Sequence, residues 1–208
     1  MPVSERIVRR SEALAARKRA TAEDVRNAPE GMTAELVDGE LFMAPRPAVA
    51  HAKAATGLSS QLFMLLDRPA EGSDHAGPPE AWHILSEPEI HVGGDIFVPD
   101  IAGWRRTRVP ALPASPFISI TPDWVCEVFS PSSYIRDRLV KASAYQRHGV
   151  PWIWYVDPST RFVEVWHNTG KTWELVTQGA ATDLFDAPPF EGATVDLRRL
   201  WDLGAAPE

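Results

Sequence analysis

The sequence predicts an α/β fold in which helices flank a mixed β-sheet. A hairpin is expected within AELVDGELFMA (34–44), because alternating apolar residues flank Asp38-Gly39. A helix is expected over 48–68, because its leucines form one stripe and Pro69 ends it. The run VPWIWYVD (150–157) is short and aromatic, which indicates a buried strand. Together these elements indicate strands interleaved with helices.

The remaining elements extend the same order without an internal repeat. Strands are predicted at 84–92 and 95–106 with Gly93-Gly94 as their turn, a strand at 123–130, a helix at about 134–148 and a hairpin at 161–167 and 172–178. We expect an N-terminal helical arm over 1–32, a main domain over 33–178 and a C-terminal extension over 179–208 that ends in a short LRRLW turn or helix.

Composition limits the class of protein. A chain of 208 residues with 44% apolar residues can bury one substantial core. The net charge of −7 argues against wholesale electrostatic coating of nucleic acid, although a local basic groove is compatible with it. The single cysteine, Cys126, allows no intramolecular disulfide and is expected to fill the core. With no apolar run long enough for a membrane span, we expect a cytoplasmic protein.

A carboxylate stands in the middle of an apolar strand. In WVCEVFSPSS (124–133), Glu127 is expected to be buried on one face of the strand. An unpaired buried carboxylate costs several kcal/mol or shifts its pKa until it is neutral. Arg105 or Arg138 could compensate the charge, and so could a bound cation.

Asp100, which follows Pro99 on the preceding strand, favours a bound cation as the compensating charge. Two carboxylates on neighbouring strands can hold a divalent cation such as magnesium, and the carbonyl of Val128 could add a third ligand. Lys141 on the next helix could then orient a water molecule and offset charge on a phosphorane-like transition state. The alternative for Lys141 is an ordinary i,i+4 salt bridge with Asp137.

Several blocks in one order carry a family resemblance. These are AELVDGEL, His51, VPD, EVFSPSS after a gap of 26 residues, and RDRLVKASAYQRHGVPWIWYVDP. Together they resemble the Uma family of restriction endonucleases, within the PD-(D/E)XK nuclease superfamily. The resemblance covers roughly residues 33–167. It implies a restriction-endonuclease-like core, magnesium- or manganese-dependent cleavage of phosphodiester bonds in DNA, and a homodimer.

The resemblance also assigns residues. Asp100 matches the aspartate of the PD element, and Glu127 matches the acidic residue of the (D/E)XK element. Phe129 occupies the position of the superfamily lysine, so the lysine role is expected to pass to Lys141. The metal ligands would be Asp100, Glu127 and the carbonyl of Val128.

Further residues are candidates for the site or its substrate. His51, Glu35 and Glu89 could reach the metal site, although each is also compatible with an ordinary structural role. Arginines near the two acidic strands could contact DNA phosphates, or could simply balance surface acids. They are Arg105, Arg106, Arg108, Arg136 and Arg138.

The sequence therefore predicts a metal-dependent DNA endonuclease that uses Asp100, Glu127 and Lys141. The alternative is a catalytically inactive nuclease fold that serves as a binding or assembly module, which the acidic charge and the displaced lysine motivate. A third hypothesis is hydrolysis of another substrate by the paired carboxylates, as in glycosidases.

Overall fold

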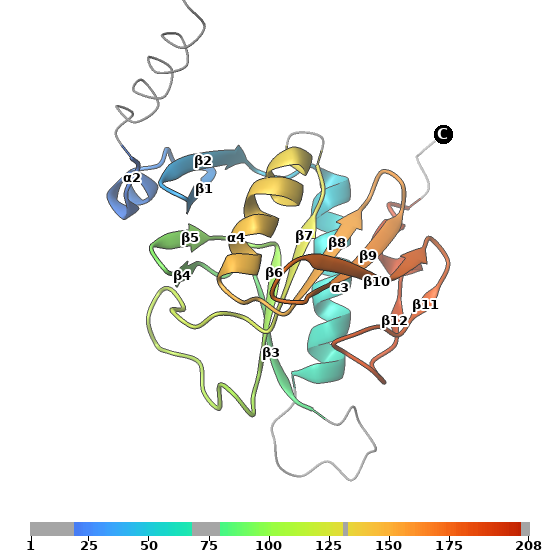
Figure 1. Cartoon of the computed structure of the whole chain (residues 1–208). Coiled ribbons are helices and arrows are strands. Elements are labelled where there is room, and N and C mark those ends of the chain that lie inside the picture. The colour runs from blue at the N-terminus through green and yellow to red at the C-terminus, as the bar shows by residue number, and fades with distance from the viewer. Residues whose placement is uncertain (1–18, 68–79, 131–132, 205–208) are drawn as a thin grey trace, which may run out of the picture.

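The computed structural model describes residues 19–67, 80–130 and 133–204. Its core is a six-stranded sheet, which Figure 1 shows between the helices. The strand order is β10-β9-β8-β7-β6-β3. The strands are β3 (Trp82–Ser86), β6 (Ile101–Arg105), β7 (Trp124–Val128), β8 (Trp152–Asp157), β9 (Phe162–Asn168) and β10 (Trp173–Ala180). β7 and β8 pair in parallel, whereas the other strand pairs assigned to this sheet are antiparallel. The expected mixed sheet is confirmed.

A smaller antiparallel sheet contains the predicted N-terminal hairpin. Its order is β2-β1-β5-β4, formed by β1 (Met32–Val37), β2 (Glu40–Pro45), β4 (Ile90–Val92) and β5 (Asp95–Phe97). Both turns that the sequence indicates are present. Asp38 and Gly39 have φ values of 54° and 78°, and Gly93 and Gly94 have φ values of 59° and 91°. Such left-handed residues are typical of tight turns between strands.

The strands predicted at 84–92 and 95–106 are each split in two. The first is broken where Glu87, with φ of 48°, precedes Pro88, and the second is broken around Pro99. Proline lacks the N–H that a sheet interior needs, and a left-handed residue turns the chain out of the ladder. Each segment therefore runs between the large sheet and the small one, and Asp100 lies at the crossing into β6.

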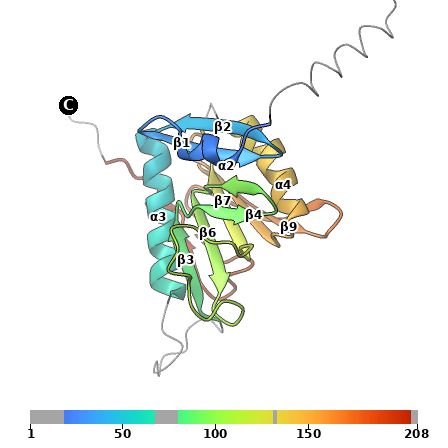
Figure 2. The same cartoon turned by 90° about the vertical axis from the view of Figure 1, so that its left-hand side faces the viewer.

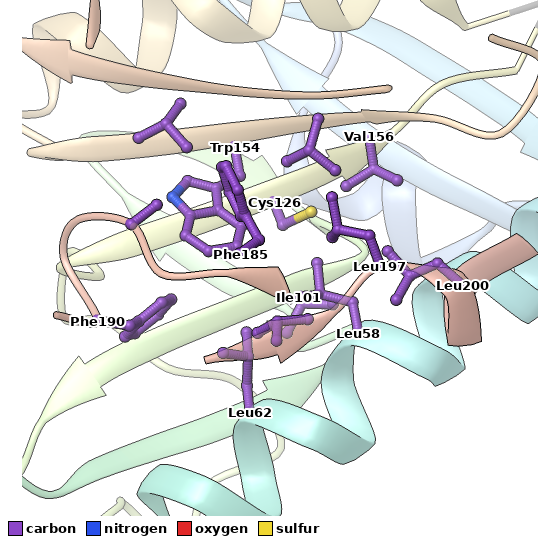
Figure 3. Packing of buried hydrophobic residues seen from close by; sticks show 14 of the residues in the cluster. Leu58, Leu62, Ile101, Cys126, Trp154, Val156, Phe185, Phe190, Leu197 and Leu200 are labelled. Atoms are coloured by element: carbon purple, nitrogen blue, oxygen red, sulfur yellow. The ribbon is translucent and has the colours of Figure 1, made fainter. Parts of the chain in front are cut away.

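Helix α3 (Val49–Leu66) covers one face of the large sheet. In Figure 3, Leu58 and Leu62 point from this helix toward Ile101 of β6. The chain after residue 180 completes this layer through β11 (Leu184–Phe185), β12 (Val195–Asp196) and α5 (Arg198–Trp201). Phe185, Phe190 and Leu200 belong to the same buried cluster, so the predicted C-terminal extension is part of the core.

The opposite face is covered by the helix expected at 134–148 and by the small sheet, as Figure 2 shows. This helix contains a π-helical segment, η1 (Arg136–Lys141), and continues as α4 (Ala142–Arg147). Asp95 links α4 to the small sheet. Its carboxylate accepts the N–H of Asp38 at 2.8 Å and lies 2.8 Å from Nε2 of His148 and 3.1 Å from Arg147.

β7 is buried on both faces, as the sequence predicts. Cys126 and Val128 belong to the cluster under α3, whereas Val125 and Phe129 belong to the cluster under α4. Glu127 is 2% exposed. The carboxylate therefore lies in the layer between the sheet and the η1–α4 helix.

The N-terminal arm is described only from residue 19, and it contains the helix α2 (Ala22–Arg26). Residues 1–18 of the predicted arm lie outside the described residues. Among the helices that the structure describes, none combines the length and the apolar character needed to cross a membrane.

Candidate active site

Asp100 and Glu127 are neighbours on adjacent antiparallel strands. Ile101 pairs with Cys126, so the next position along each strand places Asp100 opposite Glu127. Side chains of opposed residues lie on the same face, with Cβ atoms about 5 Å apart. Oδ2 of Asp100 also accepts the backbone N–H of Val128 at 2.6 Å. Both predicted acids therefore lie together, next to the Val128 peptide.

Lys141 reaches these acids from the helix. Its Nζ atom lies 2.7 Å from Oε1 of Glu127 and 2.8 Å from Oε1 of Glu35, and its side chain is 1% exposed. These contacts, and not a salt bridge with Asp137, are its ion pairs in the structure. Lys141 ends the π-helical segment, in which Asp137 is also buried. Short π-helical turns occur frequently at functional sites.

Glu35 of β1 is the third carboxylate of the cluster. Its Oε1 atom accepts the backbone N–H of Val98 at 2.9 Å, and its Oε2 atom lies 3.7 Å from Arg136. Arg136 also donates to Asp137 at 3.1 Å. Glu35 thus connects the small sheet to Lys141 and Arg136 of the helix, and it lies beside the other predicted residues.

Burial and charge act in opposite directions on this cluster. Burial raises the pKa of Glu127 well above its usual value, and the carboxylates of Asp137, Asp100 and Glu35 add to that effect against Lys141. Burial alone would lower the pKa of Lys141, but Glu127 and Glu35 outweigh it and raise the pKa. Lys141 is therefore a buried ammonium. The hydroxyl of Tyr145 donates to Oε1 of Glu127 at 2.7 Å.

His51 of α3 faces Asp100 from the other side. Its Nε2 atom lies 3.2 Å from Oδ1 of Asp100. Burial would lower the pKa of His51, but the Asp100 carboxylate and the Val128 carbonyl outweigh it and raise the pKa above the usual 6.5. Nδ1 is buried and has no hydrogen-bond partner among the described residues. His51 therefore lies beside Asp100, as the sequence allowed.

These residues line a pocket of about 310 Å³. Five carboxylates border it, against three cationic side chains and His51. The carboxylates belong to Glu35, Glu87, Asp100, Glu127 and Asp137, and the cations to Arg46, Arg136 and Lys141. Negative charge in a poorly hydrated pocket is unfavourable unless a cation compensates it.

The donor set fits a hard divalent cation. Asp100, Glu127 and the Val128 carbonyl offer oxygen atoms, which magnesium and manganese prefer, and the excess of carboxylates supplies the charge. No group of three or more histidine, cysteine or acidic side chains forms a metal cage within the described ranges. Two carboxylates and a backbone carbonyl would therefore coordinate the cation, and water would fill its remaining coordination positions.

Several predicted residues lie elsewhere. Glu89 contacts His91 and does not line the pocket. Three of the predicted arginines lie at or just beyond the far end of β6: Arg105 pairs with Glu80, Arg106 with Asp67 and Arg108 with Asp123. Arg138 pairs with Glu164 and stacks over Tyr155 and Trp166. The two arginines that were possible partners of Glu127 therefore have other partners.

The structure adds residues that sequence reasoning did not select. Tyr145 contacts Glu127, and Arg46, Glu87 and Asp137 line the pocket. Glu87 has a left-handed backbone, which is strained for a side-chain-bearing residue and occurs often at functional sites. Only Asp137 had a signal in the sequence, as an acid four residues before Lys141.

The architecture belongs to the class of nuclease-like α/β folds, which confirms the predicted fold class. A crystal structure from Anabaena variabilis ATCC 29413, described as "a putative nuclease belonging to DUF820", matches with a TM-score of 0.66 and 20% identity. The match covers 87% of this chain and 97% of that chain. No curated protein matches the chain.

The family is shown by the sequence itself. The model of the Uma2 family, described as "Putative restriction endonuclease", matches residues 22–198. The chain belongs to this family, which confirms the resemblance and extends it beyond residues 33–167.

Proposed function

We propose that this protein is a metal-dependent DNA endonuclease. The observation that carries the proposal is a fully buried lysine ammonium, Lys141, held 2.7 Å from Glu127 in a pocket that also contains Asp100. Burying a lysine together with several carboxylates is costly for stability, and such groups are concentrated at functional sites. Membership of a family described as restriction endonucleases supports phosphodiester hydrolysis as the reaction.

Asp100, Glu127 and the Val128 carbonyl would hold magnesium or manganese. When bound, such an ion supplies Lewis-acid activation of water and offsets charge on the phosphodiester. Lys141 is protonated, so it acts as a donor and not as a base. It would orient the attacking water and stabilise the negative charge that develops on the phosphate oxygens.

Glu35 and Tyr145 hold this arrangement in place. Glu35 is the second carboxylate that contacts Lys141, and Tyr145 donates to the same oxygen of Glu127 that Lys141 contacts. Oε2 of Glu127 has no such protein partner among the described residues, which leaves it available to a cation. Arg46 and Arg136 line the pocket and would contact the substrate's phosphates.

Cleavage of plasmid DNA with magnesium tests the proposal. The parent protein is expected to cut, whereas Glu127→Gln and Lys141→Ala are expected to lose activity by two orders of magnitude or more, on the order of an electrostatic catalytic contribution. Glu174→Gln, on the exposed part of β10, is the matched control for carboxylate loss. Circular dichroism melting must show that each variant is folded. Equal cleavage by all four proteins would refute the assignment.

The second candidate is an inactive nuclease fold that binds DNA without cutting it. Phe129, buried where the superfamily carries its lysine, is the observation that favours this alternative. Gel-shift binding of DNA by the parent protein, with no cleavage under magnesium or manganese, would support it. Under the first candidate, binding and cleavage occur together.

We also propose that the chain acts as a homodimer, the assembly that the family resemblance implies. Two copies would supply one site for each strand of a duplex. Size-exclusion chromatography with light scattering is expected to give twice the 23.0 kDa chain mass, and a monomer at all accessible concentrations would contradict this.

A further inference from the structure

A second pocket of about 460 Å³ adjoins the acidic one. The two share Ala48, His51 and Ser130, so they are continuous at the end of β7. The second pocket is further lined by Ala50, Phe129, Tyr134, Ile135, Asp157, Pro158 and Ser159. Its size is in the range of ligand sites in proteins.

Aromatic and aliphatic side chains form this pocket. Phe129 stacks on Tyr155 with ring centroids 4.9 Å apart and meets the ring of Tyr134 edge-on at 4.6 Å. Tyr134 is 46% exposed and Ile135 is 71% exposed. Exposed apolar side chains beside a pocket are typical of binding surfaces.

Phe129 explains why the two pockets have different chemistry. It lies two residues after Glu127 and therefore on the same face of β7. Where a lysine would extend the charged site, the phenyl ring instead begins an apolar wall. Charged side chains thus line the pocket at Glu127 and Lys141, whereas aromatic side chains line the adjoining pocket.

Apart from His51, which both pockets share, the polar groups at the second pocket do not suit a phosphate. The carboxylate of Asp157 accepts the N–H of Ser159 at 2.8 Å and its hydroxyl at 2.6 Å, and no arginine or lysine lines this pocket within the described residues. A carboxylate repels an anion but can accept a hydrogen bond from an exocyclic amino group. A flat, neutral aromatic ligand with N–H donors therefore fits better than a second phosphate.

We propose that this pocket binds one unpaired nucleobase of the substrate strand, beside the phosphate that is cut. The inference rests on the proposed endonuclease function and deepens it. A base within a duplex has both faces covered by its neighbours, so it must leave the stack to enter such a pocket. The substrate would be single-stranded DNA or DNA that is locally opened at the site, with the base packed on Tyr134 and Phe129.

Fluorescence anisotropy tests this with a labelled single-stranded DNA oligonucleotide and its duplex, with calcium in place of magnesium. For Tyr134→Ala we expect the Kd of the single strand to rise about tenfold, in line with the loss of one base–aromatic stack. The Kd of the duplex should change much less. Tyr134→Phe keeps the ring and should bind as the parent does, and Leu175→Ala, an exposed apolar residue of β10, is the control.

A second readout uses 2-aminopurine in the same single strand. Its emission is expected to change on binding to the parent protein and to Tyr134→Phe, but not on binding to Tyr134→Ala. Equal loss of affinity for single strand and duplex, or no loss for either, would overturn the inference. A shift in elution volume of Tyr134→Ala with unchanged DNA binding would assign the pocket to a second copy of the chain, and would also overturn it.

The outcomes separate this inference from the proposed function. Suppose that the parent protein cuts DNA and Glu127→Gln does not, while Tyr134→Ala keeps the parent's relative affinity for single-stranded and duplex DNA. Only the nucleobase pocket is then refuted. If the parent protein neither binds nor cuts DNA, both proposals fail together.

Discussion

The ammonium of Lys141 lies 2.7 Å from Oε1 of Glu127, although the two residues belong to different elements of the chain. The simpler superfamily pattern places both groups on one strand, two residues apart. Here the strand provides the carboxylate and the π-helical turn provides the lysine. The ion pair between Glu127 and Lys141 is thus formed by tertiary packing of the helix on the strand, and Phe129 occupies the strand position two residues after Glu127.

Loss of the buried ammonium should be costly for stability. Lys141→Met leaves Glu127 and Glu35 buried without their shared cation, so we expect the free energy of unfolding to fall by about 3–5 kcal/mol. Adding Glu127→Gln should recover part of that loss, because one uncompensated charge is removed. Urea unfolding measures both effects. Lys171→Met, at an exposed position, should change stability by less than about 0.5 kcal/mol. Similar values for both lysine variants would contradict the ion-pair cluster.

Manganese binding should depend on Asp100 separately from catalysis. Isothermal titration calorimetry is expected to detect binding to the parent protein and its loss in Asp100→Asn, because the neutral amide removes a charged oxygen ligand. Glu89→Gln, which removes an acid outside the pocket, should bind as the parent does. Undiminished binding to Asp100→Asn would show that the ion is held elsewhere.

Gly93 is required by a close approach to His148. A Cβ atom at Gly93 would lie 2.4 Å from Cε1 of His148, whereas one at Gly149 would meet nothing within 4 Å. Both glycines have left-handed backbones, so alanine adds about 1 kcal/mol of strain at each. We expect Gly93→Ala to lower stability further than Gly149→Ala by thermal and urea unfolding. In a His148→Ala background, Gly93→Ala and Gly149→Ala should lower stability by similar amounts. If Gly93→Ala still cost more, backbone strain and not the clash with His148 would be the cause.

Asp157 should contribute stability that depends on pH. Burial works to raise its pKa, but hydrogen bonds from Ser159 and Thr160 outweigh it and lower the pKa below the usual 3.8. A carboxyl group whose pKa is lowered by folding stabilises the folded state at pH values above its unfolded-state pKa. This stabilisation is lost as the pH falls through the folded-state pKa. Ser159→Ala should thus cost about 1 kcal/mol at pH 7 and less near pH 3. An equal cost at both pH values, measured by urea unfolding, would contradict this.

Local patterns were enough to predict most elements. The Asp38-Gly39 hairpin, the leucine-striped helix and the buried strand around Glu127 are all present, because each depends on periodicity or turn chemistry within a few residues. The split of the strands predicted at 84–92 and 95–106 was not predicted. Pro88 and Pro99 were visible in the sequence, but only the presence of two sheets explains why the chain enters the small sheet after Pro88 and the large one after Pro99.

The sequence by itself determined the fold class and the family, and it singled out Asp100, Glu127 and Lys141 as candidates for the site. Motif order and strand periodicity carry that information along the chain. Only the tertiary structure decided which groups surround them: Glu35, His51 and Tyr145 join the site, whereas Arg105 and its neighbours pair at the far end of β6. Such partners come from elements distant in sequence, and their selection depends on sheet register and helix packing, which no local pattern encodes.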